Sequence, residues 1–257
     1  MSLLKSVTEY GKYIIVRAYL LLTLSTDRIK TNGRTSMPSL KQIVYEKILD
    51  EILDGAYPVD YVFTEMYFVN KFQTSRAPVR DALMELCNEK ILRVIPRYGY
   101  ELVKLTENDV REITQFRLML EIESFKLSVA SNRTKLLEQI SLFNAEQRLS
   151  QSQNDYNSRS EWQKNIRFHT MLMSFANNHY AQFALQQALL TLQIAYAQHF
   201  KKVHSSPESS TTEADNYHYL LESAIRENDT EKALQILHDD ICDISRIFRS
   251  DILFPTI

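Results

Sequence analysis

The sequence predicts a mainly α-helical chain with a small N-terminal head and a larger, all-helical C-terminal half. Three observations lead to this fold class. Only four of the 257 residues are glycine, which disfavours a turn-rich all-β chain. Apolar residues recur at helical spacing through most of the sequence after Met37. A single pair of β-prone runs interrupts that pattern, and this predicts one short hairpin between the two halves.

The head contains three predicted helices. Ser39 and Gly55 bracket the first one as its N-cap and C′ residues. Thr64-Glu65 begins a second, short helix, and Ser75 caps a third that runs to about Lys90 with a proline in its first turn. The apolar stripe of the first helix falls at Leu40, Ile43, Val44, Ile48, Leu49 and Ile52.

Two β-prone runs, 92–95 and 100–103, then flank the turn Pro96-Arg97-Tyr98-Gly99. Three helices followed by a small hairpin describe a winged helix-turn-helix, which we assign to residues 38–104. Residues 105–257 read as six helical segments and predict an antiparallel six-helix bundle with a core of its own. The segments span 107–131, 134–153, 158–176, 178–203, 211–227 and 229–250.

Residues 1–37 differ from the rest, with six Lys/Arg against two Asp/Glu. We leave two interpretations open: Met37 is the natural start, or the segment is an extension whose Leu3–Leu24 part forms an extra helix. The apolar run in this segment is broken by Arg17 and is too short to span a bilayer. No membrane partner is therefore predicted.

Composition excludes other classes of protein. The four glycines are too far apart for dinucleotide- or NTP-binding loops. Two distant cysteines, Cys87 and Cys242, suggest no disulfide framework and fit a reducing cytoplasm. Neither a Ser/Cys nucleophile elbow nor an H-E-x-x-H motif is present, so we expect no enzyme activity. The alternative is a metalloenzyme on the helical bundle, and the absence of these motifs disfavours it.

The third predicted helix carries a candidate DNA-reading surface. Arg76 and Arg80 are four residues apart and share one face, rotated away from the apolar stripe of that helix. Arginine bonded to guanine is the commonest specific base contact in a major groove. The alternative is an ordinary solvated face, because residues 38–103 hold eight Lys/Arg and ten Asp/Glu and are not basic overall.

A resemblance favours DNA binding. The segment T64-E-M-Y-F-V-N-K-F-Q-T-S-R-A-P-V-R-D-A-L83 resembles the S-E-x-x-L-A-x-x-x-x-V-S-R-x-P-V-R-x-A-L signature of GntR-type transcriptional regulators. The resemblance implies a homodimer on a pseudo-palindromic double-stranded operator. It also implies DNA contacts at Ser75, Arg76, Pro78, Arg80, Arg97, Tyr98 and Gly99.

The C-terminal half holds all six histidines. Asn165 and His169 share a face of one predicted helix, while His218 and Asp240 lie on two others. Antiparallel neighbours could bring these side chains together in the bundle core, as in helical metal sites. His238 is two residues from Asp240 and is expected to point elsewhere.

This half resembles the FCD ligand-binding domain of the FadR branch, in a VanR-like form. Many such domains bind a divalent metal through D-x-x-x-H, a histidine 49 residues on and another 22 further. In this register Asn165 replaces the aspartate, His169 and His218 are retained, and Asp240 replaces the last histidine. The resemblance implies Zn²⁺, Ni²⁺ or Mn²⁺ at these four residues. The alternative is a lost metal site whose histidines line a pocket.

The resemblance further implies a small organic acid as effector, with Arg117 as the partner of its carboxylate. A second interpretation of Arg117 is an intrahelical pair with Glu121 at i, i+4. An acyl-CoA effector without metal is the alternative ligand, and the two retained histidines weigh against it.

Overall fold

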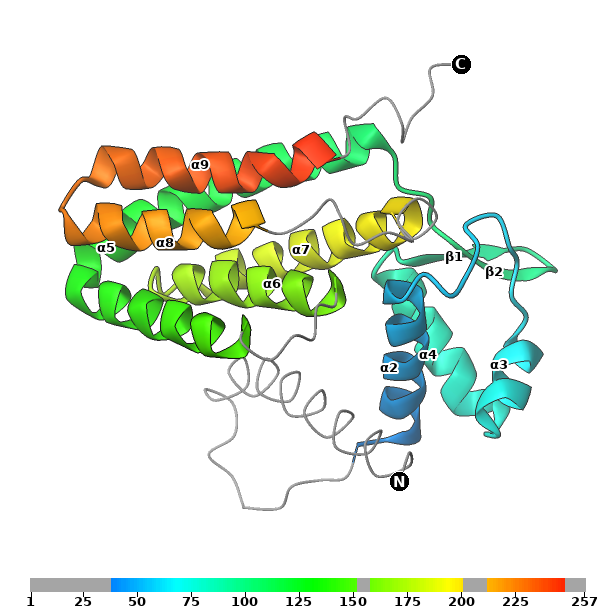
Figure 1. Cartoon of the computed structure of the whole chain (residues 1–257). Helices are drawn as coiled ribbons and strands as arrows, with labels where there is room; N and C mark the ends of the chain where they lie inside the picture. The colour runs from blue at the N-terminus through cyan, green and yellow to red at the C-terminus, as the bar shows by residue number, and fades with distance from the viewer. Residues whose placement is uncertain (1–37, 152–157, 201–211, 248–257) are drawn as a thin grey trace. The chain divides into compact units, whose positions relative to one another are not determined.

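The computed structural model describes residues 38–151, 158–200 and 212–247. They form eight α-helices and one two-stranded antiparallel sheet (Figure 1). The head contains α2 (Leu40–Leu53), α3 (Glu65–Phe72), α4 (Arg76–Asn88), β1 (Leu92–Ile95) and β2 (Gly99–Leu102). The following helices are α5 (Glu107–Gln151), α6 (Ser158–Ser174), α7 (His179–Phe200), α8 (Thr212–Arg226) and α9 (Thr230–Ile247). The mainly α-helical prediction is confirmed.

The predicted helix ends in the head correspond to recognisable caps. Gly55 has φ of 60° and follows α2, and the Ala56 N–H donates to the Glu51 carbonyl at 2.8 Å. Thr64 is the N-cap of α3, and its Oγ1 accepts from the Tyr67 N–H at 3.2 Å. These bonds fix where α2 stops and where α3 starts.

Ser75 corrects one expectation. It occupies the N-cap position of α4 with an extended backbone, but its side chain makes no capping hydrogen bond. An N-cap hydroxyl usually accepts from the second or third helical N–H. Here the third helical residue is Pro78, which has no N–H to donate. The serine therefore marks the helix start without capping it.

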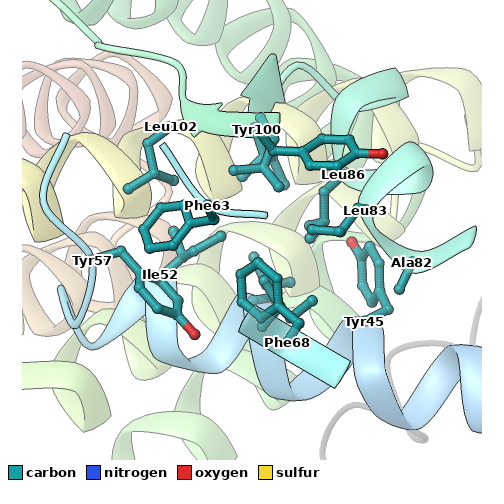
Figure 2. Packing of buried hydrophobic residues seen from close by; sticks show 14 of the residues in the cluster. Tyr45, Ile52, Tyr57, Phe63, Phe68, Ala82, Leu83, Leu86, Tyr100 and Leu102 are labelled. Atoms are coloured by element: carbon teal, nitrogen blue, oxygen red, sulfur yellow. The ribbon is translucent and has the colours of Figure 1, made fainter. Parts of the chain in front are cut away.

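The head has one apolar core, built where α2, α3, α4 and the hairpin meet (Figure 2). Val79, Ala82 and Leu86, the stripe predicted on the third helix, are fully buried. Because this stripe faces inward, the opposite side of α4 is left for other contacts. The core also contains Val44, Tyr45, Ile48, Leu49, Ile52, Tyr57, Phe63, Phe68, Leu83, Tyr100 and Leu102.

The hairpin forms the wing that the sequence predicts. β1 and β2 pair antiparallel, with Leu92 opposite Leu102 and Ile95 opposite Gly99. Phe63, just before α3, forms a bridge with Tyr100 through N–H···O bonds of 2.7 and 2.8 Å. This third short segment attaches the wing to the start of α3.

The bundle follows the predicted six segments, with the first two joined. The backbone of Asn132 leaves helical geometry at φ −160° and ψ 71°, so α5 is two helices across a kink. The Asn132 side chain accepts from the Lys135 N–H at 3.1 Å and caps the second half. The extension 1–37 and the outer ends predicted for 134–153, 178–203, 211–227 and 229–250 lie outside the described residues.

The bundle core draws from α5, α6, α8 and α9. Antiparallel α8 and α9 lie side by side (Figure 1) and are joined by a turn in which Asp229 accepts from the Lys232 N–H. No described helix is long and apolar enough to cross a membrane. The boundary between the head and the bundle, which the sequence predicts after residue 104, stays a prediction. The core residues are Phe125, Leu136, Ile140, Phe143, Phe168, Leu172, Leu221, Ala224, Ile225, Ala233, Leu237 and Ile241.

Candidate functional site

A cluster of side chains of the kinds that can bind a metal lies inside the bundle. His169 on α6, His218 on α8 and Asp240 on α9 are buried, and their ligand atoms all fall within 4.8 Å of one another. Asp240 Oδ2 is 3.4 Å from Nε2 of His169 and 3.7 Å from Nε2 of His218. Three helices distant in sequence thus aim two imidazoles and one carboxylate at a common point.

Two aromatic rings hold His218 in place. Its imidazole stacks on the Phe168 ring at 3.5 Å between centroids and 19° between planes. Phe143 approaches the same imidazole edge-on at 6.0 Å. Since both phenylalanines belong to the apolar core, the His218 side chain has little freedom to turn away from Asp240.

Several polar atoms here are buried without a hydrogen-bond partner among the described residues: Nε2 of His169, Nε2 of His218 and Oδ1 of Asn165. A buried polar group that makes no bond costs free energy, so atoms of this kind need an explanation. Asn165 is buried one turn before His169 on α6 and on the same face. The unsatisfied atoms and the donor set fit a divalent cation.

His169 also contacts a buried ion pair that is formed by Glu121 and Arg117. His169 Nδ1 lies 2.6 Å from Glu121 Oε2, and Glu121 Oε1 accepts from Arg117 Nε at 2.6 Å. The Arg117 side chain is 0% exposed. Its Nη1 and Nη2 have no hydrogen-bond partner among the described residues. The intrahelical Arg117–Glu121 pair therefore exists, and it uses only one edge of the guanidinium.

The pKa values in this group follow from burial and neighbouring charge. Burial would raise the pKa of Glu121, but Arg117 and His169 outweigh burial and lower it to about 2. Burial would lower the pKa of His169, yet Glu121 and Asp240 raise it to about 9. Burial dominates at His218 and lowers its pKa to about 4. The two carboxylates thus favour the protonated form of His169, whereas burial favours the neutral form of His218.

The head presents a second candidate site at the start of α4. Arg76 and Arg80 are exposed on a face of α4 that is rotated away from the buried stripe. Arg76 Nε lies 3.2 Å from the Met66 sulfur. Arg80 donates to Glu65 from Nε at 2.9 Å and from Nη2 at 3.1 Å. The start of α4 therefore displays two guanidinium groups beside α3, as the second helix of a helix-turn-helix does.

The wing tip carries the remaining predicted DNA contacts. Arg97 is exposed and has φ of 71°, and Tyr98 is 73% exposed. Gly99 has φ of 144°, and a Cβ added there would lie 2.1 Å from the Phe63 carbonyl oxygen. Only glycine fits this close approach of two backbones. An arginine and a tyrosine are thereby presented at the end of a short, anchored hairpin.

The structure brings together three of the four predicted metal residues, with Asn165 close by on α6. Two further side chains, Glu121 and Glu65, were given no site role by sequence reasoning. Each contacts a predicted functional residue through the fold, 48 and 15 positions away in the chain. Such long-range contacts leave no periodic signal in a single sequence, although Glu65 lies within the T64-E segment.

Two family comparisons agree with this geometry. The profile described as "Bacterial regulatory proteins, gntR family" matches residues 40–102, and that of the FCD domain matches residues 112–241. The chain belongs to the GntR family of transcriptional regulators and carries an FCD domain. It is a DNA-binding regulator and not an enzyme. The metalloenzyme alternative is therefore set aside.

Two relatives of this GntR regulator are named as transcriptional repressors. The gluconate operon transcriptional repressor of Bacillus subtilis (strain 168) is 26% identical over 211 residues, which cover 79% of this chain and 82% of the relative. The transcriptional repressor GlaR of Escherichia coli (strain K12) is 18% identical over 208 residues, covering 77% and 90%.

Solved structures share the fold of this GntR regulator. E. coli McbR/YncC superposes with a TM-score of 0.65 and 18% identity, covering 82% of this chain and 97% of that one. Lar, described as controlling expression of the Listeria monocytogenes agr system, gives a TM-score of 0.56 and 16% identity with the same coverage.

Proposed function

We propose that this regulator binds a pseudo-palindromic operator as a homodimer in the cytoplasm, and that a small organic acid in its bundle changes operator affinity. The observation that carries the effector part is the set of buried, unsatisfied polar atoms on Arg117, His169 and His218. Folded proteins keep few buried polar atoms without a partner, so these three side chains call for one. An anionic oxygen ligand supplies partners for the guanidinium.

A divalent metal belongs to this proposal. His169, His218 and Asp240 would hold it, with the amide oxygen of Asn165 as a further donor. A bound cation would supply Lewis-acid coordination to a carboxylate or hydroxyl of the effector. Glu121 would orient His169 through Nδ1, as carboxylates do behind metal-binding histidines. Zn²⁺, Ni²⁺ and Mn²⁺ all accept this donor set.

Arg117 would recognise the acid itself. Its Nε is committed to Glu121, while Nη1 and Nη2 have no described partner. These two nitrogens form the edge of a guanidinium that binds carboxylate in a bidentate manner. Because the side chain is fully buried, the ion pair would form away from competing water, where electrostatic attraction is stronger than at the surface.

On DNA, α4 would enter the major groove and the wing would reach an adjacent groove or the backbone. Arg76 and Arg80 would read base edges, and Arg97 and Tyr98 would contact DNA from the wing tip. The unused hydroxyl of Ser75 would meet a phosphate. Pro78 and Gly99 would act by shape, since Pro78 lies in the first turn of α4 without an N–H and Gly99 permits the close approach of the wing to Phe63.

The first experiment selects operators from a library of randomised 30-bp duplexes, then titrates the best duplex with gluconate and other sugar acids. Gluconate comes first because a relative is named for the gluconate operon. We expect at least one acid to change operator affinity. Linkage requires that the operator change the affinity for that acid by the same factor. If no acid in the panel shifts operator binding, and palmitoyl-CoA does, the acid proposal is wrong.

Arg117→Met gives the matching mutational test. The variant should lose acid binding by about tenfold to hundredfold while keeping operator affinity without acid. Lys126→Met is the control, because it removes the same charge from an exposed pair with Glu123 on the same helix. Unchanged acid affinity in Arg117→Met, with the fold verified by circular dichroism, would exclude Arg117 from the effector site.

A further inference from the structure

The carboxylate of Glu65 joins three elements of the head. It accepts two hydrogen bonds from Arg80 on α4, at 2.9 and 3.1 Å. The Tyr100 hydroxyl on β2 donates to its Oε1 at 3.3 Å. Glu65 itself is the first residue of α3, directly after the N-cap Thr64. One acidic side chain thus connects the first helix of the helix-turn-helix, the wing and the helix that carries the candidate reading arginines.

The two bonds leave a defined part of Arg80 free. Glu65 occupies the edge formed by Nε and Nη2. The other edge, formed by Nη1 and the second N–H of Nη2, makes no hydrogen bond with a described residue. A guanidinium bound to carboxylate along one edge can still bind guanine O6 and N7 along the other, because it has five N–H donors in a rigid plane.

The contact between Glu65 and Arg80 differs from an ordinary surface ion pair. Exposed Lys/Arg pairs with acids contribute little, because both side chains remain free in water. Here the side chain of Arg80 is 61% exposed but that of Glu65 is only 23% exposed. The acid is anchored by burial and by Tyr100, and the arginine is not. Glu65 is thus the fixed partner of the pair, and it holds the more exposed side chain of Arg80.

We propose that Glu65 is a positioning residue for sequence reading: it holds the Arg80 guanidinium so that its free edge meets one base pair of the operator. Fixing a long side chain before binding reduces the conformational entropy lost on binding. It also limits the orientations in which Arg80 could bond a phosphate or a wrong base. The inference rests on the reading role proposed above for Arg80.

Two variants separate charge from geometry. Glu65→Gln keeps the size of the side chain but removes the negative charge and one acceptor. Glu65→Asp keeps the charge but is one methylene shorter, so it no longer reaches both nitrogens of Arg80. The probe is the duplex selected from the randomised library, together with its single-base-pair substitutions and a scrambled duplex of equal length.

Arg80→Ala should relax the preference for one base pair at a single operator position. At that position we expect both Glu65 variants to discriminate about tenfold less than the native protein between the selected base pair and its substitutions. Glu65→Gln should bind the scrambled duplex more tightly than the native protein, because a negative charge near the phosphates is gone. Glu65→Asp should bind it as the native protein does. A purely structural role would instead lower binding to every duplex by the same factor.

Glu85→Gln is the matched control, because Glu85 pairs with Lys41 on α2 and does not contact Arg80. It should keep native discrimination at every position. Native discrimination in both Glu65 variants overturns the proposal, and so does a uniform loss across all duplexes with a lowered melting temperature. If Arg80→Ala itself relaxes no position, the reading role of Arg80 fails first, and that outcome is distinct from a failure of Glu65 alone.

Discussion

His169 Nδ1 lies 2.6 Å from Glu121 Oε2, and both side chains are buried in the bundle. The contact fixes which imidazole nitrogen faces the carboxylate. The other nitrogen, Nε2, is consequently directed toward Asp240 at 3.4 Å. α5 therefore contributes to the cluster on α6, α8 and α9 without offering it a ligand atom of its own.

Replacing Glu121 by glutamine should weaken metal binding by about 10- to 100-fold, the usual effect of removing a carboxylate behind a ligating histidine. Isothermal titration of chelator-treated protein with Zn²⁺ would measure the change. Glu123→Gln is the control, because Glu123 is on the same helix and its side chain is 68% exposed. Equal Zn²⁺ affinity in Glu121→Gln and the native protein would show that Glu121 does not support a metal ligand.

Metal should also stabilise the fold, because an unfolded chain does not hold the three ligands together. At a free Zn²⁺ concentration a hundred times the dissociation constant, the expected gain is about 2.7 kcal/mol, seen as a higher melting temperature. Asp240→Asn should lose most of this gain. Asp239→Asn, one residue away on α9, should retain it. A melting temperature that zinc leaves unchanged in the native protein contradicts the metal site.

The periodicity of the sequence was sufficient to predict most of the fold. The helix starts at Thr64 and Asn132 depend on local side-chain bonds, which short-range patterns encode. The exception is Ser75, where the type of residue predicts a cap but Pro78 removes one of the two N–H groups that such a cap can bond. The Phe63–Tyr100 bridge could not be predicted, because it pairs a single residue outside any strand-like run.

The site could be predicted only in part, for a related reason. His169 and His218 were found through a resemblance in spacing, whereas Glu121 contacts His169 through packing of α5 on α6. Likewise, the pair Arg117–Glu121 is visible at i, i+4, but its complete burial is not. Burial decides between a solvated pair and a binding group, and it depends on how all the helices pack.

Gly99→Ala should disrupt the wing. The added Cβ would lie 2.1 Å from the Phe63 carbonyl oxygen, at a φ of 144° that side chains rarely adopt. We expect a loss of roughly 2–3 kcal/mol in the free energy of unfolding and weaker operator binding. Gly55→Ala, at φ of 60°, is the comparison, and it should lower the free energy of unfolding by only about 1 kcal/mol. Thermal melting and operator titration would distinguish the two, and a smaller effect at Gly99 would contradict the close approach.

Stability should fall in acid partly through Glu222. Burial would raise the pKa of Glu222, but hydrogen bonds from Asn144, Ser141 and Arg226 outweigh burial and lower it. A carboxyl whose pKa is lower in the folded state contributes stability above its unfolded pKa and loses it as pH falls through its folded pKa. That contribution should therefore be intact at pH 7 and decline below about pH 4.5.

Glu222→Gln isolates this contribution. At pH 7 it should destabilise the protein by roughly 1–2 kcal/mol, since bonds to a charged acceptor are exchanged for bonds to a neutral one. As pH falls below 4.5 toward the lowered pKa of the folded carboxyl, this contribution is progressively lost, so the difference between the two proteins should narrow. Urea unfolding at pH 7, 5 and 4 measures the difference. A gap between the proteins that stays constant with pH would mean that glutamine acts through packing, because only the loss of a charged group makes the gap close in acid.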